Sequence, residues 1–385
     1  MIQRKSAERL IKLAASFRSV AVVGPRQSGK TTLCRKCFPS KPYVSLENPD
    51  TLAFSLADPR GFLGQYPQGA ILDEVQKAPH LFSYIQQILD ETKKRGLFIL
   101  TGSNNFLLQE NITQTLAGRV AYMQLLPLSL QELQEGKQLK ANYTWHIFNG
   151  GYPEQITRKI AATDWYHAYI NTYIERDVRQ LKNISNLATF SRFLKLCAGR
   201  TGQILNLANL GNDCGIDAKT AAAWLSLLES SYIIYLLKPY YENYNKRNIK
   251  SPKLYFVDTG LACALLGITE AKQISTHAAK GALFENLAVS NLLKNRFNAG
   301  KESNLYYWRD KTGNEIDILL DDVKQITTVE IKAGETIAAD YFKGLHYFDK
   351  ITTKKTNSIL LYGGKEEQKR SDGTRVCSWP ALVNL

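Results

Sequence analysis

A glycine-rich loop near the amino terminus holds the residues best suited to chemistry. Residues 24–31 read Gly-Pro-Arg-Gln-Ser-Gly-Lys-Thr, which fits the pattern G-x-x-x-x-G-K-[ST] of a phosphate-binding loop. Its glycines let backbone N–H groups turn inward around phosphates, and the helix that follows adds its positive end. We expect Lys30 to reach the β- and γ-phosphates of ATP and Thr31 to hold Mg²⁺. The expected nucleotide contacts are Gly24, Pro25, Arg26, Gln27, Ser28, Gly29, Lys30, Thr31 and Thr32.

An acidic pair follows a short apolar run further along the chain. Asp73 and Glu74 come directly after residues 70–72, Ala-Ile-Leu, which is the pattern of a Walker B strand. We expect Asp73 to reach the Mg²⁺ shell and Glu74 to act in catalysis by polarising the attacking water. The alternative is an ordinary acidic pair where a strand meets a loop. With the glycine-rich loop upstream, the pair favours hydrolysis of the nucleotide over binding alone.

Three more residues are candidates for the same site. Ser103 and Asn104 follow the apolar run of residues 96–100, and one of them could sense the γ-phosphate, although a simple turn explains them equally well. Arg119 precedes the apolar run of residues 120–125. A cation there could serve as an arginine finger toward a neighbouring subunit's nucleotide, whereas the alternative is a surface ion pair.

The elements that must position these residues follow from the hydrophobic pattern. Short apolar runs alternate with helical segments, which favours an α/β fold with a parallel, doubly wound sheet. The glycine-rich loop then lies between the first strand and the first long helix, as a phosphate site requires. The predicted strands are 19–23, 43–46, 70–72, 96–100 and 120–125, and the predicted helices are 30–38 and 80–94.

A second set of chemically capable residues lies in the last third of the chain. Glu330 and Lys332 are two positions apart on a predicted strand, so both point to one face. With Asp317 on the adjacent strand, two carboxylates and a lysine can converge. Such carboxylates bind Mg²⁺, the lysine can polarise a water, and Glu285 on the preceding helix could supply a further ligand. The alternative is a surface strand with alternating charge.

The middle of the chain is mostly helical and then strand-like. Residues 128–235 favour helices, and a helix begins at Asp217, followed by predicted strands 231–236 and 253–257. This order resembles a winged helix, in which Lys219 and Thr220 would lie near DNA. A structural or protein-contact domain is the alternative. The cations and aromatic residues between the two strands suit nucleic acid, and they are Lys238, Tyr240, Tyr241, Tyr244, Lys246, Arg247, Lys250 and Lys253.

The composition is typical of a large globular protein. The chain has 385 residues and a net charge of +14, which favours a polyanionic partner such as DNA, although a basic isoelectric point also simply varies among proteins. Six cysteines are scattered, so no disulfide framework is expected. No apolar run is long enough to span a membrane, and the first residues do not form a convincing signal peptide. We therefore expect a cytoplasmic protein with no membrane partner.

Several blocks together resemble a widespread prokaryotic family of AAA+-type P-loop ATPases with a long C-terminal region of poorly characterised role. The resemblance covers nearly the whole chain and implies an ATPase that forms homo-oligomers. Its C-terminal part resembles the PD-(D/E)XK nuclease core, here with Ile316 in place of the proline before Asp317. The blocks are GPRQSGKTTL, ILDEVQKAP, ILTGSNNFLL, LAGRV, LPLSLQEL, GGYPE, YIERDV, KLYFVDTGLACALLG, GALFENLAVSNLL, YYWRDKTGNEIDILL and VEIKAG.

These patterns predict three parts in one chain. Residues 1–150 form an AAA+-like ATPase domain, residues 151–272 a helical and winged-helix region, and residues 273–385 an α/β domain like a restriction endonuclease. In the leading hypothesis the ATP state controls DNA binding and metal-dependent DNA cleavage, with Asp317, Glu330 and Lys332 as catalytic residues. The alternative is an ATP-driven switch or scaffold that acts on a protein partner and carries a catalytically inert nuclease-like domain. An antitoxin-like or defence role is a third hypothesis.

Overall fold

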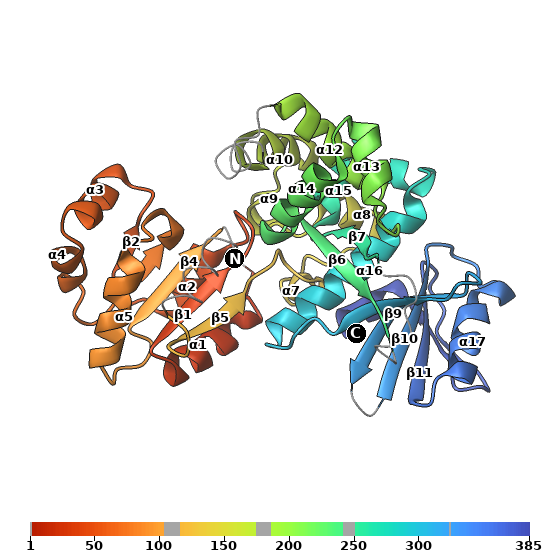
Figure 1. Cartoon of the computed structure of the whole chain (residues 1–385). Coiled ribbons are helices and arrows are strands. Elements are labelled where there is room, and N and C mark those ends of the chain that lie inside the picture. The colour runs from red at the N-terminus through yellow and green to blue at the C-terminus, as the bar shows by residue number, and fades with distance from the viewer. Residues whose placement is uncertain (1, 104–115, 175–185, 242–250, 323–324) are drawn as a thin grey trace. The chain divides into compact units, whose positions relative to one another are not determined.

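The computed structural model describes residues 2–103, 116–174, 186–241, 251–322 and 325–385 (Figure 1). By its internal contacts the chain divides into two compact units. The first contains residues 1–128, 230–232 and 296–301, and the second contains residues 129–229, 233–295 and 302–385. Most of residues 151–272 and 273–385 fall in the same unit by this measure, and the division into three parts stays a prediction.

The first unit is built on a parallel sheet with the order β2-β3-β4-β1-β5. Each pair of neighbouring strands in it is parallel, which confirms the α/β prediction for this part of the chain. The central strand β1 is buried along its whole length, as its apolar sequence requires. The strands are β1 (Ser19–Val23), β2 (Tyr43–Ser45), β3 (Ile71–Asp73), β4 (Phe98–Gly102) and β5 (Val120–Gln124).

Helices flank this sheet and hold its strands in place (Figure 1). One apolar core joins α1 and α2 to the sheet through Leu10, Leu33, Val20 and Met123. Because α2 follows β1 directly, this packing places the glycine-rich loop at the carboxyl end of the strand. The helical segments are α1 (Ser6–Ser16), α2 (Lys30–Cys37), α3 (Pro49–Ala57), α4 (Pro59–Gly64), η1 (Val75–Lys77) and α5 (Leu81–Glu91).

The second unit contains an eight-stranded mixed sheet with the order β12-β13-β11-β10-β9-β8-β6-β7. Strands β10, β11 and β13 run parallel to one another, whereas β9 is antiparallel to both β8 and β10. The strands are β6 (Ile234–Pro239), β7 (Lys253–Phe256), β8 (Leu305–Arg309), β9 (Glu315–Asp322), β10 (Gln325–Lys332), β11 (Lys355–Tyr362), β12 (Gln368–Lys369) and β13 (Arg375–Ser378).

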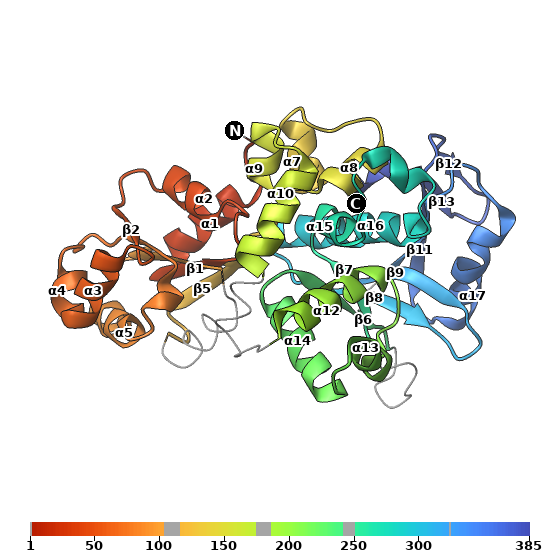
Figure 2. The ribbon, with the colours of Figure 1, turned by 90° about the horizontal axis from the view of Figure 1, so that it is seen from above.

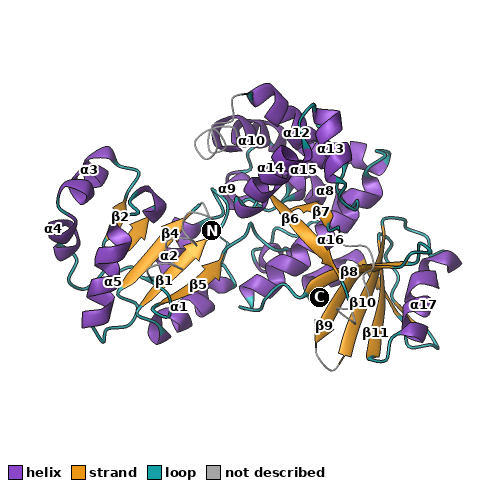
Figure 3. Cartoon of the chain, in the orientation of Figure 1, coloured by secondary structure: helices purple, strands orange, loops and turns teal. Residues whose placement is uncertain are grey.

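Helices make up most of the stretch between residues 130 and 230, as predicted (Figure 3). Nearer the carboxyl terminus, α17 covers one face of the large sheet, with Leu345 and Phe348 packed against Ile316 and Ile326 (Figure 2). The helical segments are α7 (Leu130–Glu135), α8 (Tyr143–Asn149), α9 (Pro153–Arg158), α10 (Ala162–Tyr169), η2 (Ile170–Ile174), α12 (Leu187–Gly199), α13 (Leu207–Cys214), α14 (Ala218–Ser230), α15 (Thr259–Leu265), η3 (Ala271–Ser275), α16 (Lys280–Asn298), η4 (Ala339–Phe342), α17 (Lys343–Ile351) and η5 (Trp379–Val383). Within the described ranges, we find no helix that is both long and apolar enough to cross a membrane.

The strand pair predicted as a wing forms, but in a different setting. Strands β6 and β7 are antiparallel, with Tyr235 opposite Tyr255. However, β6 also pairs with β8, so the two strands form the edge of the large sheet. The expectation that Lys253 is a loop cation is wrong, because this side chain is 3% exposed. Tyr240 is also buried. The expected DNA contacts Tyr244, Lys246, Arg247 and Lys250 lie outside the described residues.

Candidate functional site

The glycine-rich loop runs from the end of β1 to the start of α2, and its backbone requires glycine at both ends. Gly24 has a φ of +152°, and a Cβ there would lie 2.1 Å from the carbonyl oxygen of Leu125. Gly29 has a φ of +92°, in the left-handed region that side chains rarely adopt. Arg4 holds the loop to the segment after β5, because its guanidinium donates to the carbonyl oxygens of Ser28 and Leu126, each at 2.6 Å. The sequence analysis missed this arginine.

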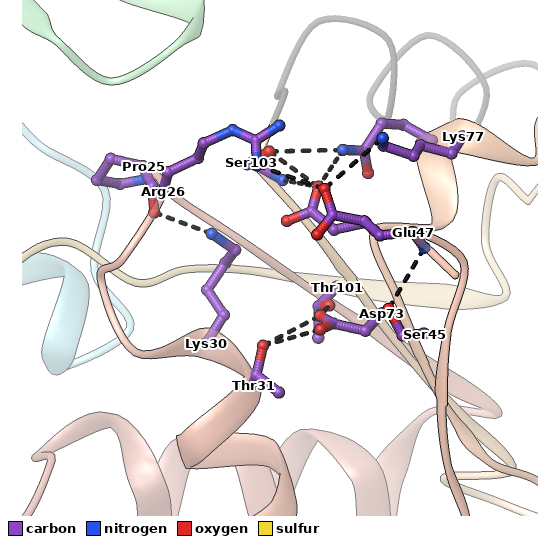
Figure 4. Close-up of polar contacts among 12 residues, drawn as sticks. Pro25, Arg26, Lys30, Thr31, Ser45, Glu47, Asp73, Lys77, Thr101 and Ser103 are labelled. Carbon is purple, nitrogen blue, oxygen red and sulfur yellow. Dashed lines mark hydrogen bonds and ion pairs between the residues drawn. The ribbon is translucent and has the colours of Figure 1, made fainter. Parts of the chain in front are cut away.

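Lys30 folds back over the loop. Its side-chain nitrogen donates to the carbonyl oxygens of Gly24 and Pro25, each at 2.9 Å (Figure 4). Burial lowers the pKa of Lys30, and the negative charges of Glu74 and Asp73 oppose this shift only in part. An ammonium held by neutral carbonyls can turn toward a phosphate oxygen, which is a stronger acceptor because it is charged.

Thr31 and Asp73 meet as the two sequence motifs predicted. The Thr31 hydroxyl lies 3.0 Å from Oδ2 and 3.2 Å from Oδ1 of Asp73. Asp73 also accepts a hydrogen bond from Thr101 (Figure 4). It accepts another, at 2.7 Å, from Tyr43, a residue that no sequence motif indicated. A hydroxyl and a carboxylate are hard oxygen ligands of the kind Mg²⁺ prefers, and a Mg²⁺ site completes its shell with phosphates and waters. The side chains present therefore fit this ion.

Glu74 lies beside Asp73 with a left-handed backbone, φ 55° and ψ 45°. This strained conformation turns its side chain toward the end of β4, where its carboxylate accepts hydrogen bonds from Ser103, at 2.9 Å, and from Gln76. Burial alone would raise the pKa of Glu74, but the charges of Lys30 and Arg26 and these hydrogen bonds outweigh it and lower the pKa. Glu74 is therefore ionised and able to accept a proton or orient a water.

Other residues of the predicted nucleotide site contact the acidic side chains around the loop rather than the loop itself. Ser103 contacts Glu74, whereas Asn104, the other candidate phosphate sensor, lies outside the described residues. Arg26 lies 3.5 Å from Glu47, to which Lys77 also pairs at 3.6 Å (Figure 4). Sequence reasoning did not assign Gln76, although its position two residues after Glu74 could have indicated a side chain within reach of that carboxylate.

Arg119 lies far from the loop of its own subunit. Strand β5 runs parallel to β1 with Val120 opposite Ser19, so Arg119 is at the edge of the sheet away from Gly24. Its guanidinium forms a double ion pair with Asp90, at 2.5 and 2.9 Å. This is the surface ion pair weighed as the alternative, and a role toward a neighbouring subunit's nucleotide stays a prediction.

In the second unit, the predicted carboxylate pair comes together on adjacent strands. Strands β9 and β10 are antiparallel, with Ile318 opposite Val329. One position further along this register, Asp317 is opposite Glu330, so the two carboxylates share one face of the sheet. The backbone N–H of Ile331 donates to Asp317 Oδ2 at 2.8 Å and fixes that carboxylate.

Lys332 completes the predicted trio. Its ammonium lies 2.5 Å from Oε1 of Glu330, while Oε2 of Glu330 is buried and has no hydrogen-bond partner among the described residues. Burial and the nearby Asp317 charge raise the pKa of Glu330, Lys332 opposes both, and the resulting pKa is about 8. A buried carboxylate oxygen without a donor is costly, so this position favours an added cation.

A second lysine, not assigned to this site from sequence, lies at the same centre. Lys253 donates to Oε1 of Glu285 at 3.0 Å, pairs with Glu315, and lies 3.7 Å from Oδ1 of Asp317. Burial and the Asp317 charge raise the pKa of Glu285, Lys253 opposes both, and the resulting pKa is about 7. Burial lowers the pKa of Lys253, but the surrounding carboxylates outweigh it and raise the pKa. The only sequence signal was a lysine opening an otherwise apolar strand.

A cavity of about 360 Å³ opens onto these groups. Its walls include Glu285, Asp317 and Lys332, together with the turn of residues 201–203. The carboxylates have the chemistry to bind Mg²⁺. In the part of the chain that the structure describes, however, no three His, Cys, Asp or Glu side chains are arranged to hold a metal ion. The present arrangement is built around the Lys253 ammonium instead.

Comparison with protein-family models divides the chain into three consecutive matches. Residues 16–134 match an AAA domain, residues 140–272 match a domain of unknown function (DUF8612), and residues 280–382 match another (DUF4143). Together with the parallel sheet and the glycine-rich loop, the first match identifies the amino-terminal unit as a P-loop, AAA-like ATPase fold.

Similar proteins exist in distant microorganisms. An uncharacterized protein of Mycobacterium tuberculosis is 29% identical over 389 residues, which cover 95% of this chain and 86% of that protein. An uncharacterized protein of Methanocaldococcus jannaschii is 24% identical and covers 69% of this chain and 61% of its own length.

Two solved structures show a weaker likeness. A Walker-type ATPase of Pyrococcus abyssi is 13% identical with a TM-score of 0.46, and the match covers 68% of this chain and 94% of that one. AMPPCP-bound DnaA from Aquifex aeolicus is 12% identical with a TM-score of 0.30, covering 58% of this chain and 86% of that one.

Proposed function

We propose that the protein binds ATP with Mg²⁺ at the loop of residues 24–31 and hydrolyses it. The observation that carries this proposal is the meeting of Thr31 with Asp73, beside an ionised Glu74. Bound Mg²⁺ would neutralise phosphate charge, held by Thr31 and Asp73. The loop N–H groups and the start of α2 would bind the phosphates.

The chain's own residues account for each step of the reaction. Lys30 leaves the carbonyls of Gly24 and Pro25 and binds the γ-phosphate. Glu74 accepts a proton from a water, whose oxygen bonds to the γ-phosphorus as the bond to the bridging oxygen breaks. ADP and phosphate then leave, and Glu74 returns the proton to solvent. Ser103 now donates to Glu74. A γ-phosphate that competes for this hydroxyl would free Glu74, which gives Ser103 its proposed sensing role.

The first experiment measures phosphate release from ATP by the purified full-length protein. Release that requires Mg²⁺ and disappears on chelation supports the proposal. Binding of ATP without any release would restrict the first unit to a nucleotide-dependent switch. The predicted homo-oligomer would be measured in the same preparation, with and without ATP, by light scattering.

We further propose that the nucleotide state controls how the second unit engages DNA, with cleavage at Asp317, Glu330 and Lys332. The net charge of +14 favours a polyanion. A polar cavity of about 390 Å³, lined by Arg200, Asn206, Asn209 and others, shares Gln203 with the acidic cavity. Side-chain amides suit base edges, so a strand lying there would reach the acidic centre with its phosphates.

In this proposal each residue of the acidic centre has a stated role. Asp317, Glu330 and Glu285 would have to draw together to hold Mg²⁺, since the described structure does not arrange three such side chains around one point, and Lys332 would polarise the water that attacks the phosphodiester. Plasmid cleavage would be measured with Mg²⁺ or Mn²⁺, with and without ATP, for the wild type and the Asp317→Ala/Lys332→Ala protein. Cleavage by the wild type alone supports the proposal, and cleavage by both points to a contaminating nuclease.

One observation favours a second candidate function. Glu285 and Glu315 of the acidic centre already pair with Lys253, which is what an inert nuclease-like domain would need in order to stay folded. The protein would then be an ATP-driven switch or scaffold for a protein partner. No cleavage under any condition, together with intact ATP hydrolysis, would support this function.

A further inference from the structure

We propose that Arg26 leaves Glu47 to bind the γ-phosphate of ATP and acts as the catalytic arginine of its own subunit. This role rests on the proposed function, because it adds a second cation to the ATP site. The sequence predicts Arg26 only as a contact of the phosphate loop and offers Arg119 as the candidate arginine finger. In the structure Arg119 pairs with Asp90 at the edge of the sheet away from Gly24.

The loop holds Arg26 in a tight turn. The backbone N–H of Ser28 donates to the carbonyl oxygen of Pro25 at 3.3 Å, which makes Arg26 and Gln27 the two central residues of the turn. The ring of Pro25 fixes the φ of the residue before Arg26, and Gln27 after it has a left-handed φ of 59°. The Arg26 side chain therefore starts from a constrained backbone within the loop that would bind the phosphates.

The guanidinium of Arg26 is held only weakly by Glu47. Its Nη1 lies 3.5 Å from Oε1 of Glu47, and the side chain reaches from the loop toward this carboxylate (Figure 4). The Glu47 side chain is 45% exposed. An exposed ion pair of this length contributes little to stability, so Arg26 can leave Glu47 at small cost.

Glu47 keeps a partner when Arg26 leaves. Lys77 pairs with the same Oε1 atom at 3.6 Å, so one carboxylate oxygen now serves two cations. A γ-phosphate carries more negative charge than a carboxylate and presents two oxygens to the planar guanidinium. Transfer of Arg26 from Glu47 to the phosphate therefore strengthens one ion pair without leaving a carboxylate unpaired.

The charge of Arg26 already acts on the two residues that the proposed reaction uses. Burial is the main cause of the lowered pKa of Lys30, and the Arg26 charge acts in the same direction. Burial alone would raise the pKa of Glu74, but the charges of Lys30 and Arg26, with two hydrogen bonds, lower it. The γ-phosphate must meet Lys30 and the water beside Glu74, so it comes within reach of Arg26 as well.

The chemical role of Arg26 is electrostatic. It forms no covalent bond and transfers no proton. Its guanidinium neutralises negative charge on the γ-phosphate oxygens while the bond to the bridging oxygen breaks and the bond to the water oxygen forms. Because Arg26 belongs to the loop that binds the same nucleotide, this charge is supplied without a neighbouring subunit.

The first test measures nucleotide binding and needs no hydrolysis. Affinities for ADP and for a non-hydrolysable ATP analogue would be measured with Mg²⁺ by calorimetry in the full-length wild type and its variants. Only the analogue carries a γ-phosphate, so Arg26→Ala should bind it about tenfold more weakly and bind ADP within about twofold of the wild type. Arg26→Lys keeps the charge but loses the planar fork, and its affinity for the analogue should lie between the two.

The second test measures phosphate release from ATP. We expect turnover to fall about a hundredfold in Arg26→Ala, because the transition state loses a cation that ADP never contacts. Lys77→Ala is the matched control, since it also removes a cation from Glu47 but lies outside the loop. Its turnover and both nucleotide affinities should stay within about twofold of the wild type.

The outcomes separate this inference from the function on which it rests. Equal losses of ADP and analogue affinity in Arg26→Ala would make Arg26 a structural part of the loop and overturn its role. Unchanged analogue affinity and turnover would also overturn it, and a loss of turnover in Arg119→Ala alone would return the role to that arginine. A wild type that binds both nucleotides without releasing phosphate would overturn hydrolysis, and the analogue affinities would then decide whether Arg26 contacts the γ-phosphate. Binding of neither nucleotide would overturn both proposals, and Arg26→Lys replaces Arg26→Ala if the alanine variant fails to fold.

Discussion

The hydroxyl of Thr31 lies 3.0 Å from the carboxylate of Asp73, although the two residues are 42 positions apart in the chain. Thr31 is the second residue of α2, after the glycine-rich loop, and Asp73 ends β3. Strand β4 lies between β3 and β1 in the sheet, so the contact depends on the order of the strands rather than on the sequence. This pair is the structural reason for proposing a Mg²⁺–ATP site.

Substitution of Lys30 should remove nucleotide binding. Lys30→Ala removes the ammonium that we propose binds the γ-phosphate, so we expect ATP affinity to fall at least about tenfold and hydrolysis about a hundredfold. Fluorescent-nucleotide titration and phosphate release would measure the two effects. Lys36→Ala, an exposed lysine on the same helix, is the control. Equal loss in both variants would point to a general charge effect.

Glu74→Gln should separate binding from hydrolysis. The amide keeps the size of the side chain but cannot polarise water, so we expect unchanged ATP affinity and a turnover lower by about a hundredfold or more. Because the pKa of Glu74 is lowered, its carboxylate stays ionised down to acidic pH. The wild-type rate should therefore not fall through Glu74 titration between pH 8 and pH 5. A rate unaffected by Glu74→Gln would remove this residue from the reaction.

Gly24→Ala tests the geometry of the loop through stability. The added Cβ would lie 2.1 Å from the Leu125 carbonyl oxygen, and a φ of +152° is already unfavourable for alanine. We expect a loss of about 2–4 kcal/mol in the free energy of unfolding of the first unit. Gly64→Ala has open space around its Cβ and should change stability by less than about 1 kcal/mol. Urea unfolding of both variants would measure the cost of this close approach, and equal losses in the two would contradict it.

His146 should make the second unit less stable at acidic pH. Burial and the Lys140 charge lower the pKa of His146, a hydrogen bond to the Lys140 backbone opposes them, and the resulting pKa is about 4. An unfolded histidine has a pKa of about 6.5, so between these values the unfolded chain binds more protons. The contribution is present above about pH 6.5 and is lost as the pH falls toward 4, by up to about 1.4 kcal/mol per pH unit.

Urea unfolding at pH 7.5 and pH 5 would measure this effect in the wild type and in His146→Gln. We expect the wild type to lose about 1–2 kcal/mol more than the variant between the two values. The carboxyls of Glu285 and Glu330 titrate over part of the same range, and they contribute equally to both proteins. The same change at the exposed His167 controls for loss of a histidine. An identical pH dependence in wild type and His146→Gln would contradict the prediction.

Much of the first unit could be predicted because its signals are local. An apolar run, a glycine-rich loop and a helix follow one another within residues 19–37. The hydrophobic pattern and the phosphate-loop motif therefore predict the same strand, loop and helix over a short stretch. The parallel sheet then follows from the alternation of strands and helices. The second unit was harder, because its large sheet takes β6 and β7 from the middle of the chain and joins them to strands near the carboxyl terminus.

The sequence by itself determined the phosphate-binding loop, the acidic pair Asp73 and Glu74, and the trio Asp317, Glu330 and Lys332, since each is a spacing of residue types along one or two strands. Only the tertiary structure decided which groups neutralise them. Lys253 reaches the acidic centre, and Arg119 pairs with Asp90 at the edge of the sheet away from Gly24. Charges interact through space, and the fold brings together side chains that are far apart in the sequence. The sequence position of an ionised residue therefore does not indicate which opposite charge it will pair with.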